Sequence, residues 1–268
     1  MKRPWRALPI ALHVASLLAF ALSHCVLFAQ AHAQSEAIHY GVSSGVDFSR
    51  GDFKLNEDTE LLYLPTTLRV GSGPWTARTT LAWLTVSGPP GAAISNGVVS
   101  TIGGKQSGFG DVVLGLTYSS NFSLLGNNYL DTTMKVKVPT ADEKRGLGTG
   151  AADYSIELEL FRSHGPWTPS AAIGYRVLGD NAGFRLHNAL LGSAGMDYRF
   201  SPAINAGGLL DWREPASRNS DDALEFVPYL SWKAGGGITL TGYGTVGLAD
   251  GSPERGIGVQ ISFRSDRR

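Results

Sequence analysis

The stretch NYLDTTMKVKVPTADEKRGLGTGAADYSIELELFR, residues 128–162, decides the fold, because it holds two alternating runs separated by a Gly-rich segment. A period of two between apolar and polar residues is typical of a β-strand with one apolar and one polar face. We predict an antiparallel hairpin folded about residue 146, with Lys135 opposite Glu157 as a pair of opposite charge. The apolar parity comprises Leu130, Thr132, Met134, Val136 and Val138, then Tyr154, Ile156, Leu158 and Leu160.

The other face of this hairpin carries charge along much of its length. Its residues are Asp131, Thr133, Lys135 and Lys137, then Asp153, Ser155, Glu157 and Glu159. A membrane-spanning barrel needs this combination, with lipid against the apolar face and water or ion pairs against the charged one. The alternative is a soluble β-sandwich, whose apolar face packs on a second sheet.

The first 33 residues are typical of an export signal. Lys2, Arg3 and Arg6 precede an apolar segment over 7–28, and Ala31-His32-Ala33 provides small residues for cleavage. We expect a cleaved signal peptide over 1–33 and a single barrel domain over 34–268. The alternatives are an uncleaved membrane anchor and a lipid-modified Cys25, although His24 stands where acylation needs a small residue.

Composition excludes several classes of protein. Without residues 1–33 the chain has 235 residues, with 20 Lys and Arg, 23 Asp and Glu, and no cysteine. This balance gives neither a nucleic-acid-binding field nor an acidic tail, and no disulfide or thiolate metal site is available. No later run reaches the roughly 18 apolar residues of a spanning helix. We therefore expect an all-β protein that needs no cofactor and binds no nucleic acid.

Strand-like alternation recurs over the rest of the chain and predicts a transmembrane antiparallel β-barrel of about twelve strands. Ten and fourteen strands remain alternatives, because residues 88–108 and 120–128 each have room for a short strand. Short turns alternate with longer polar connections, as in outer-membrane barrels with periplasmic turns and outer loops. An even strand number places both chain ends in the periplasm. The predicted strands are 38–48, 60–70, 75–86, 109–119, 129–139, 152–162, 167–177, 187–200, 203–213, 223–233, 237–248 and 256–263.

Aromatic residues fall on the lipid-facing parity near both ends of these strands. Trp and Tyr gather at membrane–water interfaces and form two girdles around a barrel. A general preference of aromatics for strands is the alternative. That preference does not explain why Trp75, Trp167 and Trp232 all lie beside short turns. The predicted girdles are Tyr40, Trp75, Tyr118, Trp167, Tyr198, Trp232 and Phe263 at the periplasmic end, and Phe48, Trp83, Tyr154 and Trp212 at the other.

Charged residues fall on the opposite parity and are predicted to face the interior. An Arg or Lys facing lipid at mid-membrane costs about 2–4 kcal/mol, which gives this assignment an energetic basis. Eight positive and nine negative residues share the inner face, so we expect mutual pairing and no strong ion selectivity. The candidate lumen-lining residues are Arg69, Arg78, Asp111, Lys135, Lys137, Glu157, Glu159, Arg176, Asp197, Arg199 and Asp211. The other inward charges are Asp47, Asp131, Asp153, Arg213, Glu225 and Lys233.

The longest predicted outer loop is Gly88–Gly108, which carries Ile94, Val98, Val99 and Ile102 among small residues. It either folds into the mouth as a constriction or lies on the surface. If it constricts the mouth, deletion of residues 91–104 raises solute flux.

Two segments resemble the outer-membrane family named for the meta-cleavage pathway of phenol degradation. The first is SGFGDVVLGLTY (Ser107–Tyr118), a strand that opens with Gly108, Gly110 and Asp111. The second is KVKVPTADEKRGLGTGAADYSIELEL (Lys135–Leu160), with Pro139-Thr140 ending one strand and Asp153-Tyr154 opening the next. The resemblance implies a single barrel that takes up aromatic or other hydrophobic compounds. Barrels usually end on an aromatic residue read by the assembly machinery, whereas here Phe263 is followed by five more residues.

Few residues support catalysis. His187 and Ser193 lie on one strand face roughly 20 Å apart, at about 3.3 Å per residue, which is too far for a base and its nucleophile. The remaining histidines after residue 33 are His39 and His164. Gly146–Gly150 precedes a strand and lacks the Lys-Ser/Thr of a phosphate-binding loop. No His/Asp/Glu spacing indicates a metal site.

We therefore expect a non-enzymatic channel in a bacterial outer membrane for passive uptake of small, aromatic or hydrophobic molecules. The expected partners are outer-membrane lipid, the solute, and the barrel assembly machinery during biogenesis. The alternatives are a non-conducting structural or surface-interaction barrel and an outer-membrane lipid hydrolase.

Overall fold

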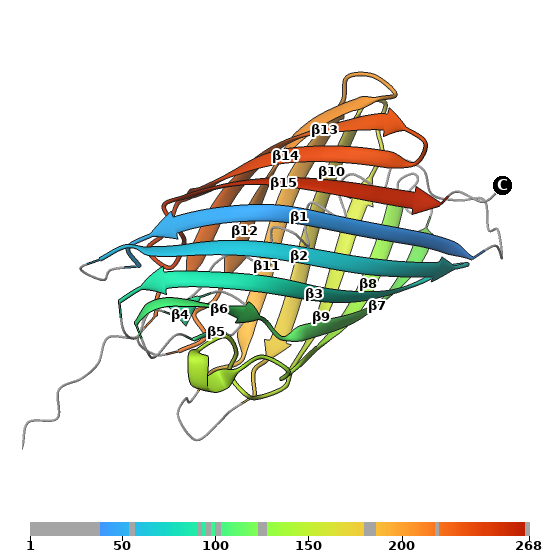
Figure 1. The fold of residues 1–268 in the computed structure, drawn as a ribbon. Coiled ribbons are helices and arrows are strands. Elements are labelled where there is room, and N and C mark those ends of the chain that lie inside the picture. Colours follow the sequence, from blue (N-terminus) through green and yellow to red (C-terminus); the bar gives the residue numbers. More distant parts are fainter. Residues whose placement is uncertain are drawn as a thin grey trace, which may run out of the picture.

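The computed structural model describes residues 38–53, 57–89, 103–122, 128–179, 186–217 and 220–265, with short pieces at 93–94 and 98–99. These residues form a β-barrel whose strands are strongly tilted (Figure 1). The strands are β1 (His39–Gly51), β2 (Thr59–Ser72), β3 (Trp75–Gly88), β4 (Ala93–Ile94), β5 (Val98–Val99), β6 (Gly104–Phe109), β7 (Val112–Phe122), β8 (Asn128–Val138), β9 (Asp153–Arg162), β10 (Trp167–Val177), β11 (Ala189–Arg199), β12 (Ile204–Arg213), β13 (Ala223–Gly235), β14 (Ile238–Gly247) and β15 (Arg255–Ser265).

Every barrel strand pairs with its sequence neighbour in antiparallel fashion, and β1 pairs with β15 to close the sheet. β6 and β7 are successive parts of one strand that both pair with β3, so the barrel has twelve strands. The predicted fold and strand number are confirmed. Closure matters in lipid because it leaves no row of backbone donors and acceptors without a partner.

A β-bulge separates β6 from β7. Trp83 pairs with Phe109 and Thr80 with Val113, so one extra residue enters the second strand between these pairs. The amide of Gly110 donates to the carbonyl oxygen of Ala82 across 2.9 Å at this point. A bulge bends its strand and shifts the register. Here the side chain of Asp111, at the bulge, points to the barrel interior and forms an ion pair with Lys137 near the end of β8.

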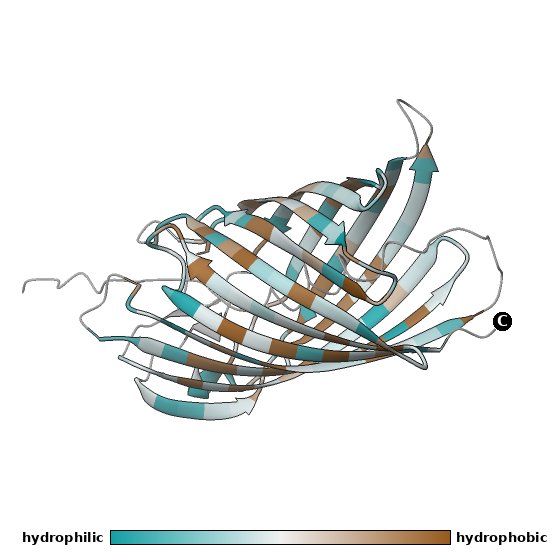
Figure 2. Cartoon of the chain, turned by 90° about the horizontal axis from the view of Figure 1, so that it is seen from above, coloured by the Kyte–Doolittle hydropathy of each residue, from teal (hydrophilic) through white to brown (hydrophobic). Residues whose placement is uncertain are grey.

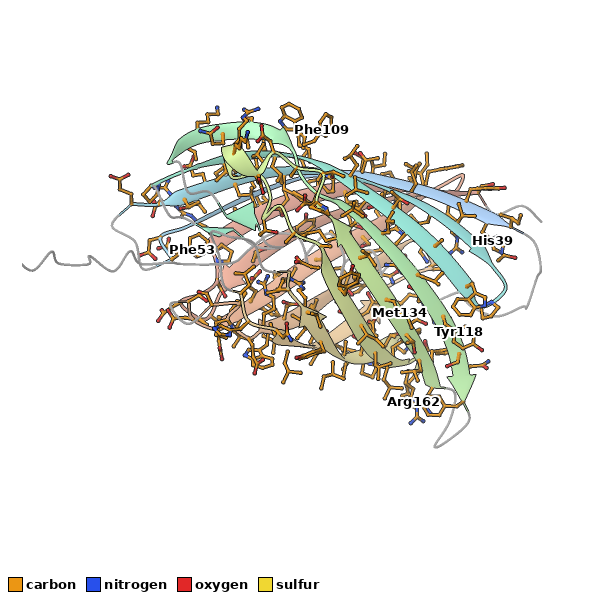
Figure 3. All side chains as sticks on the ribbon, turned by 90° about the horizontal axis from the view of Figure 1, so that it is seen from below. His39, Phe53, Phe109, Tyr118, Met134 and Arg162 are labelled. Atoms are coloured by element: carbon orange, nitrogen blue, oxygen red, sulfur yellow. The ribbon has the colours of Figure 1, made fainter. Side chains whose placement is uncertain are left out.

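The two ends of the barrel differ as expected. Short turns join β2 to β3, β9 to β10, β11 to β12 and β13 to β14 at the end where the chain enters β1 and leaves β15. Longer connections lie at the opposite end, including residues 139–152 with the 3-10 turn η2 (Glu143–Arg145) beside β6 (Figure 1). Figure 3 places His39, Tyr118 and Arg162 towards the short-turn end and Phe53 and Phe109 towards the long-loop end.

The hairpin that decides the fold is β8–β9, but its register differs from the prediction by two residues. Lys135 pairs with Ser155 and Glu157 with Thr133, so Lys135 and Glu157 are diagonal neighbours. Their side chains still form the predicted ion pair, with Nζ 3.6 Å from Oε2. The 14-residue connection over 139–152 is not a symmetric bend about residue 146, and a long side chain spans a diagonal as readily as a direct pair.

Alternating burial along the strands separates an apolar outside from a polar inside (Figure 2). In β9, Ile156, Leu158 and Leu160 are exposed on the outer face, whereas Glu157 and Glu159 are partly buried on the inner face. Aromatic contacts mark both ends of the outer face. The ring centroids are 4.8 Å apart for Trp75–Tyr118, 4.5 Å for Trp167–Tyr198 and 5.0 Å for Trp83–Phe109.

Some expectations concern residues outside the described ranges. The signal peptide over 1–33 is one, and the role of 90–102 in a mouth constriction is another, so the deletion of 91–104 stays a prediction. Within Gly88–Gly108 the described part adds β6 to the barrel wall. Among the described residues no helix has the length and apolar character needed to cross a bilayer.

Leu158→Arg tests the outer face, because it places a guanidinium in the middle of β9 against lipid. We expect a loss of about 2–4 kcal/mol in the free energy of unfolding, measured by urea titration in lipid vesicles. Val177→Arg at the long-loop end of β10 is the matched control and should cost less than about 1 kcal/mol. Equal losses at both positions would contradict the assignment.

Candidate functional site: the interior of the barrel

The structure places ten of the eleven candidate lumen residues on the inner face or its rim in buried or partly buried positions. Arg78, Lys137, Asp197 and Asp211 are buried, and the others are intermediate. Arg199 differs, because it lies exposed at the short-turn end and donates from Nη2 to the carbonyl oxygen of Gly165 at 3.2 Å. The ten inward residues are Arg69, Arg78, Asp111, Lys135, Lys137, Glu157, Glu159, Arg176, Asp197 and Asp211.

Strand register collects four cations of the inner face into one row, which we call the basic row. Directly paired positions run in the order Arg69, Arg78, Gly115, Lys135, Ser155 and Arg176, from β2 to β10. Gly115 has a packing role, because a Cβ there would lie 2.8 Å from Cγ of Arg78. The arginine crosses this glycine and donates from Nη2 to Oγ1 of Thr117 at 2.6 Å.

A second row, the acidic row, contains four carboxylates. Directly paired positions run in the order Asp131, Glu159, Ala172, Ser193, Asp211 and Glu225, from β8 to β13. On β8 the two rows are four residues apart, or about 13 Å. The row between them contains Glu157 and Arg213, which pair with the rows on either side. Each row thus carries charges of one sign. Glu157 of the middle row pairs with Lys135 of the basic row, and Arg213 of the middle row pairs with Asp211 and Glu225 of the acidic row.

These links are buried. Arg213 contacts Glu225 through Nη2 and lies 3.4 Å from Oδ1 of Asp211 through Nε, and all three residues are at most 9% exposed. Their low exposure shows that side chains fill the β8–β13 side of the interior. Buried ion pairs of this kind fix an arrangement of side chains more than they add stability, because the charges lose their water.

A buried ionic cluster around Lys137 lies at the long-loop end of this wall. The ammonium is 2.9 Å from Oδ2 of Asp153 and 3.3 Å from Oδ2 of Asp111, and it donates to Oγ1 of Thr149 at 2.8 Å. The other oxygen of Asp111 accepts from the amide of Ala141 at 2.9 Å. The cluster therefore ties three barrel strands to the connection between β8 and β9.

That connection, residues 139–152, folds inwards. Leu147 is 1% exposed and packs with Leu61, Tyr63, Leu84 and Val86 on the inner faces of β2 and β3, together with Phe53 and Ala82. We call this group the mouth cluster. Gly146 and Gly150 have φ of 68° and 69°, and a Cβ on Gly148 would lie 2.9 Å from Oδ2 of Asp111. The three glycines therefore allow the turn and its close approach to the wall.

The sequence suggested Gly88–Gly108 as the candidate for an inward loop, with a surface loop as the alternative, and did not identify Leu147 or the tyrosines of the inner face. The available signal was a single large apolar residue between glycines in Gly146-Leu147-Gly148, in a loop otherwise rich in charge. The histidines show no shared site, because His39 begins β1 at the short-turn end while His187 precedes β11 at the long-loop end. Within the described ranges no group of His, Cys, Asp and Glu has the arrangement of a metal site.

A closed antiparallel barrel with an apolar outside and a charged inside defines a membrane β-barrel of the outer-membrane type. The sequence profile of the family described as "Putative MetA-pathway of phenol degradation" matches residues 41–265. This match covers most of the chain, and the chain belongs to that family. No curated protein matches the sequence.

Solved structures share the fold at low sequence identity. An outer membrane channel from Pseudomonas putida F1 is 14% identical with a TM-score of 0.68, over 88% of this chain and 98% of that chain. The beta domain of the Bordetella autotransporter Brka is 15% identical with a TM-score of 0.52, over 85% of this chain and 99% of that chain. At such identities the likeness shows the barrel fold.

Lys137→Met tests the ionic cluster, because it leaves Asp111 and Asp153 buried without their shared cation. We expect a loss of about 3–5 kcal/mol in the free energy of unfolding, measured in vesicles. Lys105→Met, at an exposed position of β6, is the control and should change stability by less than about 0.5 kcal/mol. A Lys137 variant as stable as the control would mean that the cluster does not hold the loop.

Proposed function

We propose that this protein is an outer-membrane channel through which small, uncharged, preferentially aromatic molecules pass down their gradient. The observation that carries the proposal is the mouth cluster, an apolar surface inside a barrel whose interior also carries rows of charged residues. A barrel that only anchors a surface structure does not require an apolar site on its inner wall beneath the inward connection 139–152.

Family membership and the fold comparison with a channel support this proposal. The family is named for phenol degradation, and the similar barrel from Pseudomonas putida F1 is an outer membrane channel. Both point to passage of solutes, and the family name points to aromatic ones. The apolar outer face and the aromatic contacts at its two ends support residence in the outer membrane.

The charge pattern of the interior favours uncharged solutes. Cations and anions of the inner face are nearly balanced in number, and Lys135, Lys137 and Arg213 form ion pairs, so the interior offers little net attraction to an ion. Besides Asp47, Arg69 and Arg78, the wall from β13 through β15 to β3 presents hydroxyls. Ser231 and Thr241 are 2.8 Å apart between their oxygens, as are Thr67 and Thr80. A neutral molecule loses less solvation energy than an ion when it moves along such a wall.

A non-conducting structural barrel is the second candidate, and the buried pairs of the β8–β13 wall favour it. The two functions differ in one property, which is whether the interior opens when residues 139–152 leave it.

Shortening the inward loop tests the channel directly. Replacement of residues 143–149 by Gly-Ser-Gly removes Leu147 from the mouth cluster and should raise conductance in a planar bilayer several-fold over the wild type. The control replaces only Glu143, Lys144 and Arg145 by serine, which keeps Leu147 and should leave conductance near the wild-type value. If neither the wild type nor the shortened variant gives discrete steps, the protein is a structural barrel.

A further inference from the structure

One row of the inner face has a near-mirror arrangement of side chains, and we call it the tyrosine row. Directly paired positions across six neighbouring strands, from β11 through β15 to β1, read Asp197, Gly207, Tyr229, Tyr243, Gly258 and Asp47. Two adjacent tyrosines stand at the centre, a glycine follows on each side, and an aspartate ends each arm.

The glycines let each tyrosine reach its aspartate. A Cβ at Gly207 would overlap the phenol ring of Tyr229, and a Cβ at Gly258 would overlap that of Tyr243. Each ring therefore lies across the neighbouring strand and points towards the carboxylate one strand further on. This requirement explains both glycines at central strand positions, where glycine otherwise weakens a strand.

The two aspartates differ in what they bind. Oδ1 of Asp197 accepts from the hydroxyl of Tyr229 at 2.9 Å, and Oδ2 accepts from Nδ2 of Asn205 at 3.0 Å. Asp47 is only 1% exposed, and the hydroxyl of Tyr243 is the one donor that interacts with it; no other hydrogen-bond donor reaches its two oxygens within the described part of the chain. A buried carboxylate with so few donors is costly, so a site that retains one has acceptor capacity to offer.

The surroundings of Asp47 are aromatic and apolar. Tyr63 pairs directly with Asp47 on β2, Leu84 pairs with Tyr63 on β3, and Gly108 pairs with Leu84 on β6. Leu147 covers this last position, since a Cβ on Gly108 would overlap its side chain. The carboxylate of Asp47 therefore lies at the edge of the mouth cluster, next to the surface that Leu147 covers.

We propose that Asp47 and the mouth cluster form a binding site for a small aromatic molecule with one hydroxyl group. The hydroxyl donates to Asp47 beside Tyr63 and Tyr243, and the ring packs on the inner faces of β2 and β3 in place of Leu147. A single acceptor set in an apolar surface matches a molecule with a single donor on an apolar ring. This proposal rests on the proposed function and names the solute class and the residue that recognises it.

Ligand-observed NMR on the purified full barrel in detergent micelles tests the site, with phenol, anisole and benzylamine as probes. Anisole has the same ring without the donor, so the wild type should bind phenol about tenfold more tightly than anisole. Leu147→Ala should tighten phenol binding, because it vacates the cluster surface. Asp47→Leu should remove the preference for phenol, and the variant should still fold, because Tyr243 is the one donor that loses an acceptor.

Asp197→Asn is the matched control, because it changes the other aspartate of the tyrosine row and should keep the preference for phenol. Asp47→Asn, which retains an acceptor but not the charge, should keep part of it. The proposal is overturned by equal binding of phenol and anisole to the wild type. It is equally overturned by an unchanged preference in the folded Asp47→Leu variant, or by benzylamine binding more tightly than phenol.

Conductance separates this proposal from the proposed function. Asp47-dependent phenol binding to a barrel that is silent in bilayers supports the site and contradicts the channel. Discrete currents from a barrel whose phenol binding ignores Asp47 support the channel and overturn the site.

Discussion

The structure depends on one constraint, which is that hydrocarbon offers no hydrogen-bond partner to the backbone. In the antiparallel sheet closed by the β1–β15 pair, the backbone donors and acceptors of each strand bond to its two neighbouring strands. Successive side chains of a strand point to opposite faces of this sheet, which explains the period-two pattern of the sequence. Lipid then selects apolar residues for the outer parity, and the ionic groups in the middle of the strands are left to the inner parity.

Confinement of the charges to a narrow interior has consequences for function. Register arranges them into a basic row and an acidic row, and residues between the rows join the two signs. This network fills one side of the barrel and fixes its side chains. The other side, from β13 to β3, has hydroxyls, tyrosines and the mouth cluster, and it is the part of the interior on which a neutral molecule can be recognised.

The sequence alone predicted the features that follow from period two, namely an antiparallel barrel of about twelve strands and the inward parity of most of the charged residues. It could not predict features that depend on register and loop path. Lys135 and Glu157 pair along a diagonal because the connection between their strands is folded against the wall and is not a simple bend. Leu147 was missed because its role depends on which strands the loop meets. The difference between Asp47 and Asp197 depends on side-chain geometry that parity does not contain.

The central claim is that β9 has lipid on one face and a packed, charged interior on the other. The sole cysteine of the sequence is Cys25, within the predicted signal peptide, so single cysteines at 154–161 can carry spin labels without competition. Labels at even positions should collide with oxygen dissolved in lipid, and labels at odd positions should be poorly accessible to oxygen. Equal access of oxygen to both parities, or access of a water-soluble nickel complex to the even positions, would contradict the account.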